Sequence, residues 1–235
     1  MARLHNFPPL TAALCGMMAL LASPGARAAD TPYSIAIGYA RAHFNVKSGE
    51  LGGPAGTTPP GVTVGVDDVN ALGFEATVQL GDGWAASLAG GLPPVVHLRA
   101  KGAGSALGRV GSARAWFPAA LVSYTFNRSG SVRPFVAAGL NYTAFTSTEV
   151  LGNYTAAFQG THSVVRPKSS FGPVIKLGVE VPLGERMMLL AGYSRYGIKT
   201  TADITTETPG VGPITRSITM RSDPGVVSLL VGYRF

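Results

Sequence analysis

The chain has 235 residues, of which 31 are glycine, and only 13% are charged, against about 25% in an average soluble domain. Its hydrophobic fraction of 46% excludes intrinsic disorder despite the net charge of +7, and the glycine content and low charge argue against a coiled coil or a helical bundle. No uninterrupted apolar run approaches the roughly 18–20 residues of a transmembrane helix. A membrane-spanning β-barrel remains compatible with this composition.

The N-terminus has the features of a secretory signal peptide. A basic start at Arg3 precedes an apolar run over 10–22, and Ala26-Arg27-Ala28 fits the small-x-small cleavage rule. We therefore expect residues 1–28 to be a cleaved signal peptide and 29–235 to form a single domain. Cys15 lies inside the signal, so the expected mature chain has no cysteine for disulfides, thiol catalysis or metal binding.

The rest of the chain alternates apolar and small or polar residues with the period of two that is typical of β-strands. In the segment after Asn70, for example, Leu72 and Phe74 alternate with Gly73 and Glu75. The pattern predicts eight strands, at about 33–39, 72–80, 84–92, 120–126, 134–142, 171–181, 187–193 and 227–235.

The connections between these strands strictly alternate in length. Three are short turns, at 81–83, 127–131 and 182–185, and four are long and rich in Gly, Thr, Ser or Pro, at about 47–69, 93–115, 146–168 and 200–223. Outer-membrane barrels have this arrangement, with short periplasmic turns and long outer loops. We predict an all-β fold, an eight-stranded antiparallel transmembrane β-barrel with four long extracellular loops, in the outer membrane of a bacterium.

The apolar face of each strand is expected to meet lipid and the opposite face to line the interior. A soluble lipocalin-like barrel, with its apolar face inward, is the alternative. Such a barrel needs a polar exterior, but the strand faces opposite the apolar ones are mostly Gly, Ala, Ser and Thr. The expected channel-lining residues are Glu75, Thr77, Lys176, Glu180, Leu190, Ser194, Tyr196, Ser228, Leu230 and Arg234. So narrow and weakly charged an interior does not suit hydrated solutes.

The interior charges separate by depth. Glu180 and Arg234 lie near the periplasmic strand ends, and Lys176 and Glu75 lie about 13 Å further up at ~3.3 Å per residue. Unpaired charges are costly in a narrow bore, so each should find a partner. Our hypothesis is that Glu180 and Arg234 pair across the barrel floor and help to close it; the alternative is that these pairs serve packing only.

Several stretches together resemble a known family. The chain ends in alternating Val231, Tyr233 and Phe235, which resembles the outer-membrane insertion signal. With Val66-Asp-Asp-Val-Asn-Ala-Leu-Gly73, Arg133-Pro-Phe-Val-Ala-Ala-Gly-Leu-Asn-Tyr-Thr143 and Ile198-Lys-Thr-Thr-Ala202, the mature chain resembles the OmpW family of small outer-membrane channels.

The resemblance implies a narrow, largely apolar lumen and passive uptake of small hydrophobic molecules, which leave sideways through the barrel wall. Pro94-Val-Val-His97 matches a Pro-x-x-His pattern that is common in the family, whereas Ser194 stands where relatives often carry a bulky aromatic residue. Expected partners are outer-membrane lipid and lipopolysaccharide, the barrel-assembly machinery through the C-terminal strand, and small apolar solutes. The alternative function is a structural or surface-binding barrel, similar to an adhesin or receptor, without transport.

Other chemistry finds little support in the sequence. The second long loop carries His97, Arg99, Lys101, Arg109 and Arg114 with no acid; these cations either meet lipopolysaccharide phosphates or only aid solubility. No nucleotide-binding or hydrolase motif occurs, and no histidine has a neighbour at metal-ligand spacing. We expect no enzyme activity, cofactor, metal or nucleic-acid partner, although a hydrolytic rim site of His97, His162 and Ser163 remains an alternative.

Overall fold

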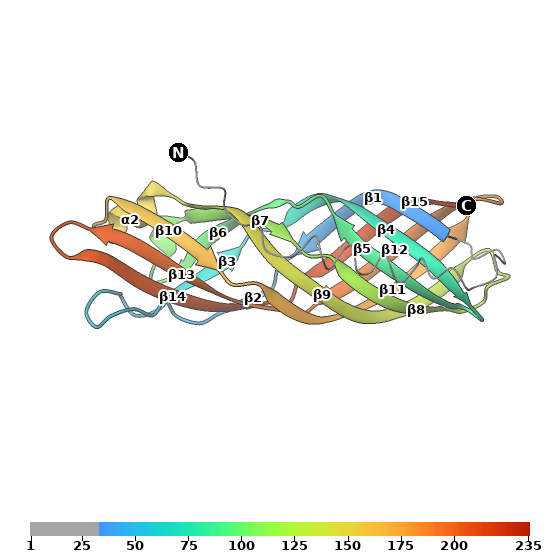
Figure 1. Ribbon diagram of the computed structural model, residues 1–235, viewed down its shortest axis with the longest axis horizontal. Helices are drawn as coiled ribbons and strands as arrows, with labels where there is room; N and C mark the ends of the chain where they lie inside the picture. The colour runs from blue at the N-terminus through green and yellow to red at the C-terminus, as the bar shows by residue number, and fades with distance from the viewer. Residues whose placement is uncertain (1–32) are drawn as a thin grey trace, which may run out of the picture. The chain divides into compact units, whose positions relative to one another are not determined.

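The computed structural model describes residues 33–235, so the expected signal peptide lies outside the described residues. Eight antiparallel strands close into a barrel in which each pairs with the next along the chain and the last pairs with the first (Figure 1). They are β1 (Tyr33–His43), β4 (Val69–Gly81), β5 (Trp84–Gly91), β8 (Ala119–Thr125), β9 (Arg133–Val150), β11 (Ser170–Pro182), β12 (Met187–Tyr196) and β15 (Gly225–Arg234). The predicted fold class and strand order are confirmed.

Alternation along the strands separates an apolar outer face from an inner face. On β1, Ile35, Ile37 and Tyr39 are exposed, while Ser34 and Ala36 at the alternate positions are buried. The same holds on β11, where Ile175 and Leu177 are exposed and Val174 and Lys176 are buried. A contiguous apolar exterior of this kind requires a nonaqueous surrounding, which lipid supplies.

Short turns join the strands at one end of the barrel, here called the short-turn end. Between β4 and β5, Gly81, Asp82 and Gly83 all adopt positive φ, and Asn127 does so after β8. These are residue types that accept the left-handed region at low cost. The chain therefore encodes tight hairpins at the positions that the sequence predicted.

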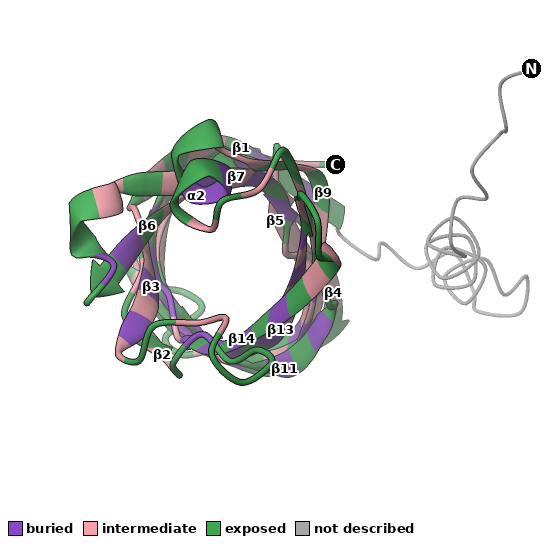
Figure 2. Ribbon diagram, turned by 90° about the vertical axis from the view of Figure 1, so that its left-hand side faces the viewer, coloured by how far each residue is buried: buried purple, intermediate pink, exposed green. Residues whose placement is uncertain are grey.

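The four long connections are located as predicted, but they are not irregular. Most of their residues continue the barrel wall as a ring of strands, here called the wall extension (Figures 1 and 2). It contains β2 (Val46–Ser48), β3 (Val62–Val66), β6 (Val95–Gly102), a 3-10 turn (Ser105–Leu107), β7 (Arg109–Trp116), the upper half of β9, helix α2 (Gly152–Ala157), β10 (His162–Pro167), β13 (Ile198–Thr208) and β14 (Gly212–Ser222). Neither helical segment within residues 33–235 is long enough to cross a membrane.

Candidate functional site

The wall extension encloses an apolar cavity of about 330 Å³, here called the tip cavity. Inward-facing aliphatic side chains from strands on all sides of the extension line it. They include Leu51, Val62, Val64, Val66, Val96, Leu98, Val110, Val150, Ile204, Ile218 and Met220, with Phe145, Tyr154 and Phe158 as aromatic members. Such a lining suits an uncharged, hydrophobic molecule and offers few hydrogen bonds to a hydrated one.

Arg216 on β14 connects the parts of the chain around the far end of this cavity. It is 2% exposed, and its Nε and Nη2 donate to the Thr57 carbonyl oxygen at 3.2 and 2.9 Å. Its guanidinium also lies 4.1 Å from the ring centroid of Phe158, next to α2. Arg216 therefore links the loop around Thr57 to the segment that follows α2.

Aromatic and aliphatic side chains separate the tip cavity from the bore of the barrel. Buried Val96, Ala113 and Ala115 pack with Phe117 and Phe145, and we call this group the apolar layer. Phe117 also makes an edge-on contact with Tyr196, with ring centroids 5.9 Å apart. Because the layer contains no charged side chain, an apolar molecule crosses it at lower cost than an ion.

Below the apolar layer, the bore is crossed by an ion pair between Lys176 Nζ and Glu75 Oε2. Both side chains are more than nine-tenths buried, and Lys176 also lies 5.4 Å from the ring centroid of Phe135. A cavity of about 50 Å³, here called the bore cavity, touches this pair, Ser194 and Tyr196. The interior is otherwise filled by side chains, as expected of an eight-stranded barrel.

The barrel wall is interrupted beside the bore cavity. The register of β5 with β8 ends at Ala89–Ala119, and the next backbone hydrogen bond on this side runs from Ala115 N to the Pro94 carbonyl oxygen. We call the facing stretches 90–93 and 116–118 the seam gap. Pro93 and Pro94 lie at its β5 side and have no N–H with which to close the ladder, whereas the Pro118 carbonyl oxygen on the facing stretch accepts a hydrogen bond from Tyr142 N on β9.

The bore cavity reaches from the interior to this interruption. Its lining includes the buried Glu75 and Lys176, and also Gly91, Leu92 and Phe117 at the seam gap. Leu92 is 63% exposed on the barrel exterior. The cavity thus touches residues of both the bore and the lipid-facing surface.

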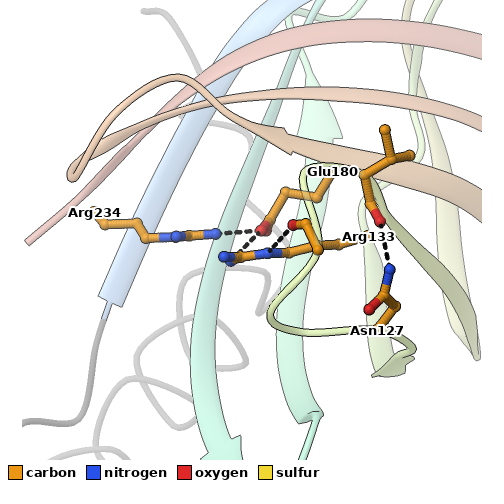
Figure 3. Close-up of polar contacts among 6 residues, drawn as sticks. Asn127, Arg133, Glu180 and Arg234 are labelled. Atoms are coloured by element: carbon orange, nitrogen blue, oxygen red, sulfur yellow. Dashed lines mark hydrogen bonds and ion pairs between the residues drawn. The ribbon is translucent and has the colours of Figure 1, made fainter.

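Three charged side chains meet near the short-turn end, and we call them the floor triad. The Glu180 carboxylate pairs with Arg234 and, at 3.2 Å, with Arg133 Nη1 (Figure 3). Arg133 is held in turn by a hydrogen bond from its Nε to the Gly130 carbonyl oxygen at 3.3 Å. The expected pair of Glu180 and Arg234 forms, and Arg133 is a partner that sequence analysis missed.

The other predicted lining residues face inward as well. Leu190 and Leu230 are buried together with Met188, and the Ser228 hydroxyl donates to the Gly192 carbonyl oxygen at 3.4 Å. Thr77 is half-buried on β4. The structure places all ten predicted residues on the inner face: Glu75, Thr77, Lys176, Glu180, Leu190, Ser194, Tyr196, Ser228, Leu230 and Arg234.

The C-terminal residues Val231, Tyr233 and Phe235 face outward and are exposed. The rings of Tyr233 and Phe235 lie 5.2 Å apart, and the Tyr233 hydroxyl accepts a hydrogen bond from Arg186 Nη1 at 3.0 Å. Phe235 N donates to the Tyr33 carbonyl oxygen, which ties the chain end to β1.

The basic second loop forms the β6–β7 hairpin, and an acid from the first loop approaches it. Asp67 pairs with Arg99 at 2.7 Å and lies 4.0 Å from Arg109, which neutralises part of the charge that the sequence presents as uncompensated. The proposed hydrolytic rim does not assemble: the Ser163 hydroxyl bonds with Thr155 and Thr206 rather than with a histidine. Within residues 33–235, no three His, Cys, Asp or Glu side chains are placed to hold a metal.

The sequence did not single out the tip cavity. A signal was present, because Val62, Val64 and Val66 alternate with small residues, as do Ile218 and Met220. The glycine and threonine content of these stretches suggested irregular loops instead, and the pairing that turns them into a wall is nonlocal.

Comparison with known proteins supports the barrel assignment. The family model described as "OmpW family" matches residues 45–235. The chain is 24% identical over 218 residues to the dibenzothiophene metabolism operon protein PahQ of Pseudomonas aeruginosa, covering 92% of this chain and 93% of that protein. It is 31% identical over 130 residues to outer membrane protein W of Vibrio cholerae, covering 55% and 56% of the two chains.

Solved structures share the fold. The crystal structure of the outer membrane protein OprG from Pseudomonas aeruginosa superposes with a TM-score of 0.77 at 23% identity, covering 87% of this chain and 96% of that one. The solid-state NMR structure of AlkL in lipid bilayers gives a TM-score of 0.59 at 20% identity, covering 99% and 97%.

Proposed function

Because this chain belongs to the OmpW family and is an outer-membrane β-barrel, we propose that it is a channel for passive uptake of small hydrophobic molecules, which it releases sideways into the membrane. The short-turn end is then periplasmic and the wall extension faces the cell exterior. The apolar tip cavity of about 330 Å³ carries this proposal, because it offers a lining that hydrophobic solutes prefer to water. The relative PahQ is named as a protein of a dibenzothiophene metabolism operon, which agrees with a small, hydrophobic aromatic molecule as cargo.

The route has three proposed steps. A solute enters the tip cavity and then passes the apolar layer at Phe117 into the bore cavity. Straight passage to the periplasm would require it to displace the Glu75–Lys176 pair and then the floor triad, both of which are costly to separate. The seam gap beside the bore cavity offers a less costly exit, because it leads from an apolar wall into lipid.

The ten inward-facing residues take different parts in this proposal. Leu190 and Leu230 keep the bore apolar, Ser194 and Tyr196 shape the bore cavity, and Thr77 and Ser228 fill the space between the charged levels. Glu75 and Lys176 block the bore at mid-depth, and Glu180 and Arg234 block it at the floor. We propose that the barrel-assembly machinery recognises the outward-facing Val231, Tyr233 and Phe235.

Uptake by cells with and without the protein tests the transport function. We expect faster entry of a radiolabelled medium-chain alkane in the presence of the protein, and no change for a hydrophilic solute of similar size. Equal entry of both solutes with and without the correctly inserted protein would contradict transport and favour a structural or surface-binding barrel.

A bulky group attached at the seam gap tests the sideways exit. We expect Leu92→Cys, labelled with a bulky methanethiosulfonate reagent, to lose most of its alkane uptake and to recover it on reduction. Val122→Cys is the matched control, because Val122 is another exposed, outward-facing residue, on β8. Full uptake by the labelled Leu92→Cys protein would place the exit elsewhere.

A further inference from the structure

A second feature lies on the barrel exterior, where β1, β15 and β12 run side by side and continue into β2, β14 and β13. A hollow of about 380 Å³ opens there at the outer end of the barrel. Arg41, His43 and Arg195 line it together with Tyr193 and Val227, and so do the acidic residues Asp68 and Asp223. It is separate from the tip and bore cavities, which lie on the inner side of the wall.

Strand register explains why the surface is hollow at this point. Gly225 lies between His43 on β1 and Arg195 on β12, so the middle strand has no side chain where its two neighbours carry cationic or titratable ones. A Cβ on Gly225 would lie 2.6 Å from the Tyr193 hydroxyl oxygen, so that hydroxyl lies over the glycine backbone. The hollow is thus built by a small residue flanked by long ones.

A row of like charges lies on the outer side of the hollow. Lys199, Arg221 and Lys47 are directly opposite one another on β13, β14 and β2, and all three are exposed. Like charges directly opposite each other destabilise a sheet, so this row has a cost that an anion would relieve. Along the strands it lies four residues from the His43–Gly225–Arg195 row, about 13 Å at ~3.3 Å per residue.

Acidic groups compensate only part of this charge. Arg221 pairs with Asp223 at 3.1 Å, and Asp68 pairs with His43 at 2.8 Å and with Arg41 at 3.8 Å. Within the described chain, 33–235, Lys47, Lys199 and Arg195 form no ion pair. In the hollow itself Arg41, His43 and Arg195 therefore face two carboxylates, and the uncompensated cations are Arg195 and, in the row beyond it, Lys47 and Lys199.

The surface below the hollow is apolar. Val227, Leu229 and Tyr39 are exposed on the strands that descend into the membrane-facing band, and Tyr193 lies at its upper limit. A hollow bordered by uncompensated cations and lying directly above a lipid-facing apolar surface matches a molecule with an anionic head and acyl chains.

We propose that this hollow binds the phosphorylated headgroup of an outer-leaflet lipid, the lipid A part of lipopolysaccharide. Arg195, Lys199 and Arg221 contact the phosphates, and the acyl chains pack on the apolar surface at Val227 and Leu229. The site holds a lipid against the outside of the wall and is independent of what passes through the barrel.

Binding of purified lipid A to the full protein in detergent, measured by native mass spectrometry, tests the site. We expect the double variant Arg195→Gln/Lys199→Gln to bind bisphosphorylated lipid A about tenfold more weakly, because it loses two charge-assisted contacts. The matched control is Arg128→Gln/Arg166→Gln, which removes two exposed cations, from the turn after β8 and from β10, and should change the affinity less than about twofold. Equal weakening of both double variants would show a general charge effect and overturn the proposal.

Two further probes distinguish the ligand chemistry. Dephosphorylated lipid A with the same acyl chains should bind the unaltered protein and the Arg195→Gln/Lys199→Gln variant equally weakly. Tight binding of that probe to the unaltered protein would show that the phosphates are not recognised. Inorganic phosphate should not displace bisphosphorylated lipid A at equal concentration, and if it does, the hollow is a free-anion site and the lipid proposal is wrong.

Discussion

Lys176 on β11 and Glu75 on β4 form an ion pair across the bore, although 101 residues separate them in the sequence. Four steps around the eight-stranded ring separate β11 from β4, so the pair connects opposite sides of the barrel. Both side chains are more than nine-tenths buried, so bulk solvent does not compensate either charge if its partner is lost. The pair therefore connects opposite walls of the bore at this depth.

Breaking this pair on one side should destabilise the barrel. We expect Lys176→Met to lower the free energy of unfolding by roughly 3–5 kcal/mol, because it leaves Glu75 as an uncompensated buried charge. The double variant Glu75→Leu/Lys176→Met should recover most of the loss. Urea unfolding in detergent, followed by fluorescence of Trp84 and Trp116, measures both; a double variant no more stable than the single one would contradict the explanation.

The floor triad makes a separate prediction about ions. Glu180→Gln removes the charge that holds Arg133 and Arg234 together, so these two cations should separate and small-ion conductance in planar bilayers should rise. Glu185→Gln, an exposed acid in the adjacent turn, is the control and should leave conductance unchanged. If the sideways exit is correct, alkane uptake by Glu180→Gln stays at its original rate, whereas a parallel rise in uptake would indicate an exit through the floor.

The apolar layer should limit the rate at which solutes reach the bore. Phe117→Ala removes a ring from this layer, and we expect alkane uptake to rise several-fold because less side-chain displacement is needed. Phe171→Ala, which removes an exposed, outward-facing ring on β11 away from the seam gap, should have little effect. Initial uptake rates at matched protein levels in the membrane decide between these expectations, and similar rates for both variants would remove Phe117 from the route.

The buried hydroxyl of Tyr154 in the tip cavity leads us to expect that the segment around α2 loses stability at alkaline pH. Burial raises the pKa of its hydroxyl from an ordinary 10.0 to about 12, and the nearby positive charge of Arg216 acts in the opposite direction. A raised pKa stabilises the folded state below pH 10, and this contribution is lost as the pH rises towards 12. Hydrogen exchange of α2 should therefore accelerate between pH 10 and 12, after correction for the intrinsic exchange rate, and Tyr154→Phe should flatten this dependence. An unchanged profile in the variant would assign the transition to another group.

Much of this architecture could be predicted from the sequence because strand alternation is a local pattern. The outward positions of Ile35 and Ile175, the inward positions of Glu75 and Lys176, and the short turn at Asp82 all follow from period and turn chemistry. The Glu180–Arg234 pair was predictable because both residues lie near periplasmic strand ends. Its second partner, Arg133, was not, because its approach depends on which strands become neighbours and in what register.

The wall extension shows the limit of local patterns. Stretches around Val64 and Ile218 alternate, yet their Gly and Thr content is equally typical of loops, and only cross-strand pairing decides between the two. The tip cavity exists because these stretches pair, so it could not be inferred before the pairing was known. The seam gap likewise depends on which stretches become neighbours, because Pro94 lies opposite Ala115 only once the two strands have paired.

The interruption between β5 and β8 also affects how copies of the protein meet in the membrane. A closed barrel has no free strand edges, and the seam gap restores two short ones to a surface that faces neighbouring proteins. Edge strands with free N–H donors recruit further strands, but Pro93 and Pro94 remove two donors on the β5 side of the gap. The same two prolines that keep β5 from pairing across the gap therefore leave fewer donors for strand exchange with an adjacent barrel.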